Sequence, residues 1–139
     1  MILLDTSGLL AALFADQNQH EACAQVLRDA EPPFLLSPFI LAETDYLIQK
    51  YGGIVAERLF LTEVVRGAYE LVIFDKEDMR LAVGVVATYS DLQIGIADAS
   101  LVALAERYEC RDVLTLDLRH FRAMRPGRRR RFRISPADA

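Results

Sequence analysis

The sequence has few cysteines and histidines, the residues that form the disulfides of small secreted proteins and bind zinc. It contains two cysteines, Cys23 and Cys110, far apart in the chain, and two histidines, His20 and His120. Lone cysteines among Ala, Val and Leu are typical of buried, reduced side chains, so we expect no disulfide framework. The two histidines are isolated in the sequence, with no His or Cys cluster around them, which argues against a zinc site.

Long apolar runs are missing as well. No segment approaches the ~20 consecutive apolar residues that a membrane-spanning helix needs. The chain runs from Met1 directly into Ile2-Leu3-Leu4-Asp5, without the basic stretch and cleavable apolar segment of a secretory signal. These absences favour a soluble, cytoplasmic protein as the expectation.

The net charge is small, but the charged residues are unevenly distributed. The formal net charge of the 139 residues is -4. Residues 1–100 contain 6 Lys or Arg against 15 Asp or Glu, whereas residues 101–139 contain 10 against 5. An acidic body with a basic end can hold a cation in one place and a polyanion in another.

Short apolar segments alternate with amphipathic ones along nearly the whole chain. Within each apolar segment the residues are apolar without interruption, rather than alternately apolar and polar. This pattern is typical of parallel strands covered on both faces. We therefore predict an α/β fold, a three-layer α/β/α sandwich with a short, mainly parallel central sheet. Residues 1–139 form one domain, in which 126–139 are a basic, loosely structured end. The predicted strands cover 2–5, 34–36, 71–74, 113–116 and 132–134, and the predicted helices cover 9–14, 18–30, 38–51, 54–66, 75–89, 96–108 and 118–124.

Four acids stand where such a sheet forms its binding crevice. In parallel α/β sheets, sites lie beyond the carboxyl ends of the strands. Asp5 and Asp117 each end a predicted strand, and Asp98 lies in the first turn of a helix that follows a loop. Glu43 lies in an otherwise apolar helix after the strand 34–36. We expect these four carboxylates to converge.

Each acid alone also fits a simpler role, as a turn residue, a helix cap, a charge near a helix dipole or a solvated side chain. Together they would repel one another and raise their pKa values unless a cation were bound. Carboxylate ligands with water suit Mg²⁺ or Mn²⁺. Such ions activate water and align phosphates for in-line attack, so the cluster indicates phosphate chemistry.

At this point the residues resemble a family, the PIN-domain toxins of VapBC toxin–antitoxin systems. Four of the family's motifs occur in order across nearly the whole chain. They are a strand running into Asp-Thr-Ser, a Glu in a helix after Ser-Pro, an Asp-Ala-Ser helix start, and a closing Thr-Leu-Asp with an aromatic. Here they stand at Leu4–Ser7, Ser37–Glu43, Ile96–Leu101 and Leu114–Phe121.

The resemblance implies a toxin endoribonuclease that needs Mg²⁺ or Mn²⁺ and leaves a 5′-phosphate and a 3′-hydroxyl. Asp5 and Asp98 would be the central metal ligands, and Glu43 and Asp117 would complete the acidic quartet. Two hydroxyls, those of Ser7 and Thr115, would orient the acids or bind metal waters, although capping and turn roles fit them equally well.

This chain departs from some relatives at one place in that motif. They carry a further acid shortly after the fourth position, whereas here Leu118-Arg119-His120 follows Asp117. A second metal would then be weakly held, or would arrive only with the substrate.

The resemblance also implies a homodimer and a cognate VapB-like antitoxin, which places a basic side chain against the acidic pocket. The antitoxin would lay an apolar segment over the first helices, at Leu9, Leu10, Leu13 and Phe14, although ordinary core packing is the stronger explanation for any one of them.

RNA contacts are expected at the basic end, because clustered Arg side chains bind phosphates and release counterions. Phe132 would stack on a base there. A solvated end is the simpler alternative. The segment 89–98 resembles actinobacterial members, which favours a structured substrate, transfer or ribosomal RNA (such as the sarcin–ricin loop) rather than messenger RNA. The candidate arginines are Arg119, Arg122, Arg125, Arg128 and Arg129.

Two other classes of protein use acids at the end of a similar sheet. Receiver-like signalling modules place paired acids after the first strand and a Lys after a late strand, but here Thr6-Ser7-Gly8 follows Asp5 and no Lys follows Lys76. Haloacid dehalogenase-type phosphatases need Asp-x-Asp, which this chain lacks. A catalytically inactive PIN-like binding scaffold is the third alternative, although all four acids are present.

Overall fold

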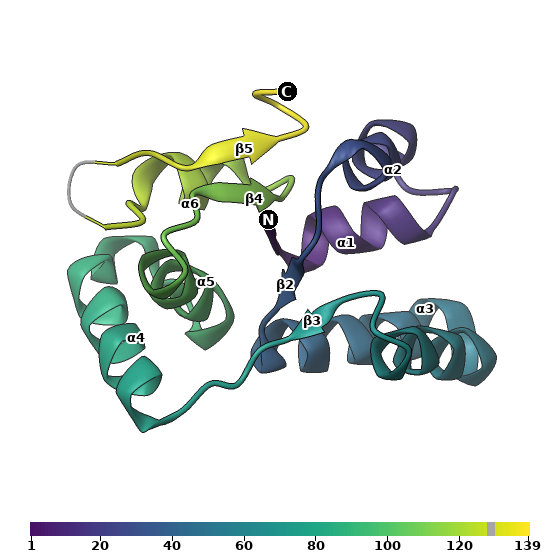
Figure 1. Ribbon diagram of the computed structural model, residues 1–139, viewed down its shortest axis with the longest axis horizontal. Helices are drawn as coiled ribbons and strands as arrows, with labels where there is room; N and C mark the ends of the chain where they lie inside the picture. The colour runs from purple at the N-terminus through teal and green to yellow at the C-terminus, as the bar shows by residue number, and fades with distance from the viewer. Residues whose placement is uncertain (128–129) are drawn as a thin grey trace.

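The computed structural model describes residues 1–127 and 130–139, which form one five-stranded sheet flanked by helices (Figure 1). The strand order is β3-β2-β1-β4-β5, and every neighbouring pair is parallel. All five carboxyl ends therefore lie at the same edge of the sheet. The strands are β1 (Ile2–Leu4), β2 (Phe34–Leu36), β3 (Glu70–Leu71), β4 (Asp112–Leu114) and β5 (Arg133–Ser135).

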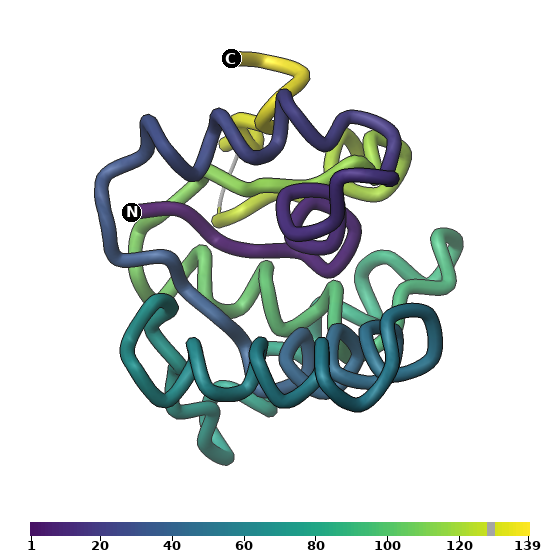
Figure 2. Tube along the Cα trace, turned by 90° about the vertical axis from the view of Figure 1, so that its right-hand side faces the viewer, coloured from purple at the N-terminus to yellow at the C-terminus, as the bar shows by residue number. Residues whose placement is uncertain are grey.

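Helices cover both faces of this sheet, which confirms the predicted three-layer arrangement. In Figure 1, α4 and α5 pack together on one side and α1 and α2 on the other. Figure 2 shows β1, in purple, running through the middle of the molecule with helices on either side. The helices are α1 (Thr6–Leu13), α2 (His20–Asp29), α3 (Pro38–Val65), α4 (Lys76–Thr88), α5 (Ile96–Arg107) and α6 (Leu118–Ala123), with a 3₁₀ turn, η1 (Ser90–Leu92).

The two central strands are buried on both faces, as their uninterrupted apolar sequence predicts. Leu3, Leu4, Val113 and Leu114 are fully buried. Each such side chain stabilises the fold by roughly 1.5–3 kcal/mol. The core is therefore densest directly beneath the carboxyl ends of β1 and β4, and it fixes whatever follows those strands.

Helix α3 begins as predicted. Ser37 caps it by accepting a hydrogen bond from the Phe39 backbone N–H (3.2 Å), and Pro38 occupies the first turn. The two predicted helices, 38–51 and 54–66, are both present within Pro38–Val65 and meet at a kink, where Gly53 of the predicted Gly-Gly break has non-helical backbone angles. Gly53 absorbs the kink alone with φ 85° and ψ 176°, a left-handed φ that glycine adopts without a Cβ clash.

Strand β3 is shorter and earlier than predicted. It covers Glu70–Leu71 rather than residues 71–74, and it is exposed at the edge of the sheet. The Val72 backbone N–H still donates to the Leu36 carbonyl, but Asp75 then caps α4, so the chain must leave the sheet.

The C-terminal end also differs from the loosely structured segment that its composition indicates. Its described part, 130–139, contains β5, which pairs with β4 as the predicted strand 132–134 requires. Phe132 and Ile134 are buried, and the Phe132 ring packs edge-on against Phe121, with centroids 5.3 Å apart. The expectation that Phe132 stacks on an RNA base is therefore wrong, because its ring belongs to the core.

Cys23 and Cys110 are both free and buried, as predicted. Within residues 1–127 and 130–139, none of the helices is both long and apolar enough to cross a membrane.

Candidate active site

Asp5 lies at the end of β1 and its side chain is buried, with 6% of the residue exposed. Its Oδ2 accepts hydrogen bonds from the Thr115 hydroxyl at 2.6 Å and from the Ser7 hydroxyl at 2.8 Å. The same two hydroxyl oxygens accept from the backbone N–H groups of Asp117 (3.0 Å) and Leu116 (2.9 Å). The two hydroxyls thus bridge Asp5 to the chain that leaves β4.

This environment raises the pKa of Asp5 to about 6, from an ordinary value of 3.8. The main cause is burial, which disfavours the charged carboxylate, and the negative charge of Asp98 adds to it. The hydrogen bonds from Thr115 and Ser7 act in the opposite direction. A carboxylate held in this way is poised to gain from a nearby cation.

Asp98 stands in the first turn of α5, and its charge interacts with those of the other three acids. Burial raises its pKa, contact with His120 lowers it, and the charges of Asp117 and Glu43 raise it again. Since Asp98 in turn raises the pKa of Asp5, the four predicted acids form one electrostatically connected group. Glu43 is the exposed member, on α3.

A buried pair of hydroxyls ties together the two helices that carry Glu43 and Asp98. Ser37, at the start of α3, lies 2.8 Å from Ser100 of α5, oxygen to oxygen, and both are fully buried. The Ser100 hydroxyl donates to the Ala97 carbonyl (2.7 Å), so its oxygen is left to accept from Ser37. The pair fixes the spacing between the two helices beside the acids.

His120 is a member of the cluster that the sequence reasoning missed. Its Nδ1 lies 2.9 Å from Asp98 Oδ2 and 3.0 Å from Asp117 Oδ2. The description of His120 as isolated was wrong, because sequence distance hid a contact across α5 and α6. A local signal did exist: Asp117 caps α6 by accepting from the His120 backbone N–H, which brings residues 117 and 120 together.

The residues present fit a divalent cation of the Mg²⁺ or Mn²⁺ type. Asp98, Asp117 and His120 each offer a ligand atom, and these atoms all lie within 4.8 Å of one another. Asp5 and Glu43 do not belong to this group of three, but their charges interact with that of Asp98. Oxygen donors dominate the set, and a bound cation would offset both the burial of charge and the repulsion between the acids that raise the pKa values of Asp5 and Asp98.

The predicted RNA-binding arginines do not share one environment. Arg122 forms two hydrogen bonds with Asp138, at 2.9 and 2.6 Å, and the Arg125 guanidinium donates to carbonyls at the end of α6, including that of Arg122 at 2.7 Å. Arg119 is exposed. The remaining two, Arg128 and Arg129, lie outside the described residues.

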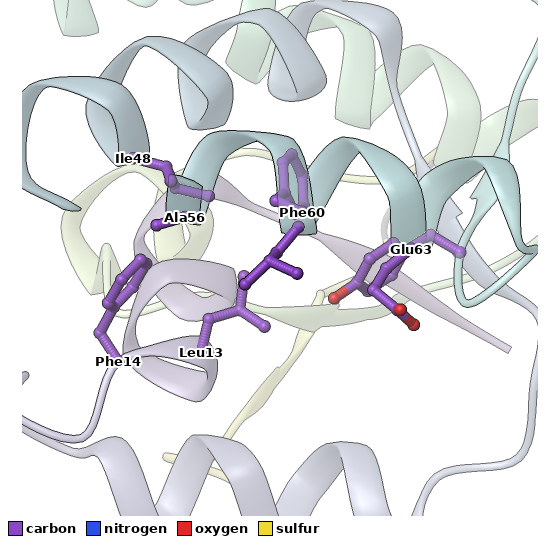
Figure 3. Close-up of a pocket in the computed structure, with 8 residues that line it drawn as sticks. Leu13, Phe14, Ile48, Ala56, Phe60 and Glu63 are labelled. Carbon is purple, nitrogen blue, oxygen red and sulfur yellow. The ribbon is translucent and has the colours of Figure 1, made fainter. Parts of the chain in front are cut away.

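Leu13 and Phe14, two of the four predicted groove residues, line an apolar pocket of about 230 Å³ between α1 and α3. Figure 3 shows them facing α3 side chains across this pocket. Leu10 is half-buried against the core, and Leu9 is fully buried within it, so Leu9 is not available to a partner. Also lining the pocket are Ile48, Ala56, Leu59, Phe60, Glu63 and Tyr69.

Comparisons with known proteins agree on one family. The model of the PIN domain matches residues 2–125. Ribonuclease VapC26 of Mycobacterium tuberculosis (strain ATCC 25618 / H37Rv) is 40% identical over 135 residues, which are 97% of this chain and 100% of that protein.

Two solved structures share the fold at low sequence identity. Mycobacterium tuberculosis VapC20, described as a sarcin–ricin loop cleaving toxin, superposes with a TM-score of 0.79 at 17% identity, over 86% of this chain and 92% of that one. A toxin–antitoxin complex from Klebsiella pneumoniae gives a TM-score of 0.69 at 18% identity, over 91% and 94% of the two chains.

Proposed function

This chain belongs to the PIN-domain family, in its VapC ribonuclease branch, and on that premise we propose that it is a toxin endoribonuclease whose acidic quartet uses Mg²⁺ or Mn²⁺ to hydrolyse RNA. The quartet consists of Asp5, Glu43, Asp98 and Asp117, with Asp5 and Asp98 as the central ligands. The observation that carries the proposal is the group formed by Asp98, Asp117 and His120, whose possible ligand atoms all lie within 4.8 Å of one another. The charges of Asp5 and Glu43 interact with that of Asp98, which extends the group to all four acids.

When bound, a divalent cation would lower the pKa of the water that it coordinates and would neutralise charge on the reacting phosphate. The chain's own residues hold and orient that site. Ser7 and Thr115 fix the Asp5 carboxylate from one side. The Ser37–Ser100 pair fixes the helices that carry Glu43 and Asp98. The products are RNA ends with a 5′-phosphate and a 3′-hydroxyl.

For the substrate we propose structured RNA, transfer or ribosomal rather than messenger RNA, on the resemblance of residues 89–98 to actinobacterial members. Arg119 is the arginine we place on the RNA backbone first, because its side chain is exposed. Arg122 can join it only by giving up its ion pair with Asp138.

We propose that a cognate antitoxin restrains the enzyme. The apolar pocket lined by Leu13, Phe14 and Leu59 suits an apolar segment of that partner, and a basic side chain from it would compensate the acidic cluster. We also propose that the toxin is a homodimer. Analytical ultracentrifugation, which measures the mass of the protein in solution, tests this directly.

The decisive experiment compares RNA ends after induction of wild type and of Asp5→Asn, with 5′-phosphate ends mapped across all cellular RNA. We expect discrete new ends with wild type only. Asn keeps the side-chain shape and an acceptor for Ser7 and Thr115, so circular dichroism should show both proteins folded. Identical end profiles from two folded proteins would favour the alternative, an inactive PIN-like scaffold. The receiver-like alternative has no support once the family is known.

A further inference from the structure

We infer that His120 is a direct ligand of the catalytic cation and that it makes this site prefer Mn²⁺ to Mg²⁺. The inference rests on the proposed function, and it adds a nitrogen donor to a quartet made only of carboxylates. It also replaces the further acid that some relatives carry after Asp117, a position where this chain has Leu118-Arg119-His120.

The distances suit shared coordination. An octahedral ion with ligands at about 2.1 Å places neighbouring ligand atoms about 3 Å apart. His120 Nδ1 lies 2.9 Å from Asp98 Oδ2 and 3.0 Å from Asp117 Oδ2, which are separations of that size. The imidazole therefore already stands where an adjacent ligand would stand.

Hydrogen bonding alone does not account for this arrangement well. A ring nitrogen holds at most one hydrogen, yet Nδ1 faces two carboxylate oxygens at nearly equal distances. One hydrogen cannot point at both acceptors with good geometry. A cation contacted by all three atoms satisfies the nitrogen and both carboxylates together.

His120 is also held in place. Its backbone N–H donates to the capping carboxylate of Asp117, and the next residue, Phe121, is buried in the core. The His120 side chain is 20% exposed, so the ring is enclosed beside Asp98 rather than free in solvent. A ligand that is already ordered loses little conformational freedom on binding.

The preference for Mn²⁺ follows from ligand chemistry. Imidazole suits transition-metal ions, whereas Mg²⁺ is served by carboxylates, carbonyls and water. Replacing one oxygen donor by the His120 nitrogen therefore strengthens Mn²⁺ binding more than Mg²⁺ binding. The affinity ratio of the two ions should depend on residue 120.

The test uses electron spin echo spectroscopy of Mn²⁺ bound to the full-length protein. Imidazole coordination gives a ¹⁴N coupling that water and carboxylates do not. The chain has only two histidines, so His20→Asn is a matched control; His20 lies outside the cluster, with its Nδ1 2.7 Å from the Ala11 carbonyl. We expect the coupling in wild type and His20→Asn, and its loss in His120→Asn.

Binding titrations provide a second measurement. We expect His120→Asn to weaken Mn²⁺ binding by about ten-fold or more and Mg²⁺ binding by less than about three-fold. Asn retains a hydrogen-bond donor, so a purely positioning role for His120 would leave both affinities nearly unchanged. Mn²⁺ binding that needs Asp98 but shows no ¹⁴N coupling would overturn this inference while leaving the proposed nuclease site intact. Absence of any Mn²⁺ or Mg²⁺ binding that depends on Asp98 would overturn both.

Discussion

At the scale of single residues, Asp5 is a buried carboxylate whose charge opposes the stability of the fold. It is buried, receives two hydroxyl hydrogen bonds and still has a pKa raised to about 6. The folded protein therefore holds the Asp5 proton more tightly than the unfolded chain does. Because of this difference, the contribution of Asp5 to the stability of the metal-free protein falls as the pH rises from about 4 to about 6.

Removing that charge should stabilise the metal-free protein. In the presence of a chelator at about pH 8, we expect Asp5→Asn to raise the free energy of unfolding by about 1–3 kcal/mol, an advantage that shrinks at about pH 4, where wild-type Asp5 is protonated. Urea denaturation at the two pH values measures this difference. Adding Mn²⁺ should stabilise wild type and not the variant. A variant less stable than wild type at both pH values would contradict the assignment of burial as the dominant cause.

At the scale of elements, α1 reaches its position only because residue 8 has no side chain. A Cβ on Gly8 would lie 2.6 Å from the Leu114 carbonyl oxygen, which is the backbone of β4. The close approach of α1 to β4 brings Ser7 of the helix to Thr115, 3.2 Å between hydroxyl oxygens. The glycine therefore sets the distance between the two groups that hold Asp5.

Gly8→Ala should consequently affect both stability and metal binding. We expect a loss of about 1–3 kcal/mol from overpacking and weaker Mn²⁺ binding, because α1 must move away from Thr115. Gly84→Ala is the matched control, since Gly84 lies in α4 with open space around it. That variant should be neutral or gain about 0.5–1 kcal/mol. Thermal unfolding and calorimetric titration compare the two, and equal behaviour would contradict the role given to Gly8.

The sequence predicted elements better than it predicted contacts between them. Uninterrupted apolar strands and clear caps, such as Ser37-Pro38, act locally, so they placed nearly every helix and strand. The place of His120 in the acidic cluster was not predicted, because its partner Asp98 is 22 residues away in the sequence. Only the packing of the folded chain brings the two residues together. The predicted strand 132–134 is confirmed by β5, but the burial of the Phe132 ring was not predicted, because the neighbouring arginines dominate the local composition.

At the scale of the whole molecule, one helix joins the acidic cluster to the apolar pocket. The first part of α3 carries Glu43, and the part beyond Gly53 contributes Leu59 to the pocket. The proposed catalytic acid and most of the α3 side chains that line the pocket thus lie in different stretches of the same element, with Ile48 of the first stretch as the exception. A variant in the second stretch can therefore separate the two activities.

Leu59→Glu should weaken inhibition by the antitoxin without reducing RNA hydrolysis. Leu59 is 64% exposed, so the substitution should not disturb folding, but it places a charge in the apolar pocket. We expect the variant to cleave RNA like wild type and to bind the cognate antitoxin at least about ten-fold more weakly. Val65→Glu is the control, because Val65 is exposed on the same helix and is not among the residues lining the pocket. Equal inhibition of the two variants would place the antitoxin elsewhere.

The kink at Gly53 has an evolutionary consequence. Gly53 interrupts the helical geometry of α3. The structural effect of a substitution in the part of α3 beyond Gly53 therefore need not reach the part that carries Glu43. The partner surface that we propose beyond Gly53 can then change its specificity while the acidic cluster that we propose for hydrolysis keeps its geometry.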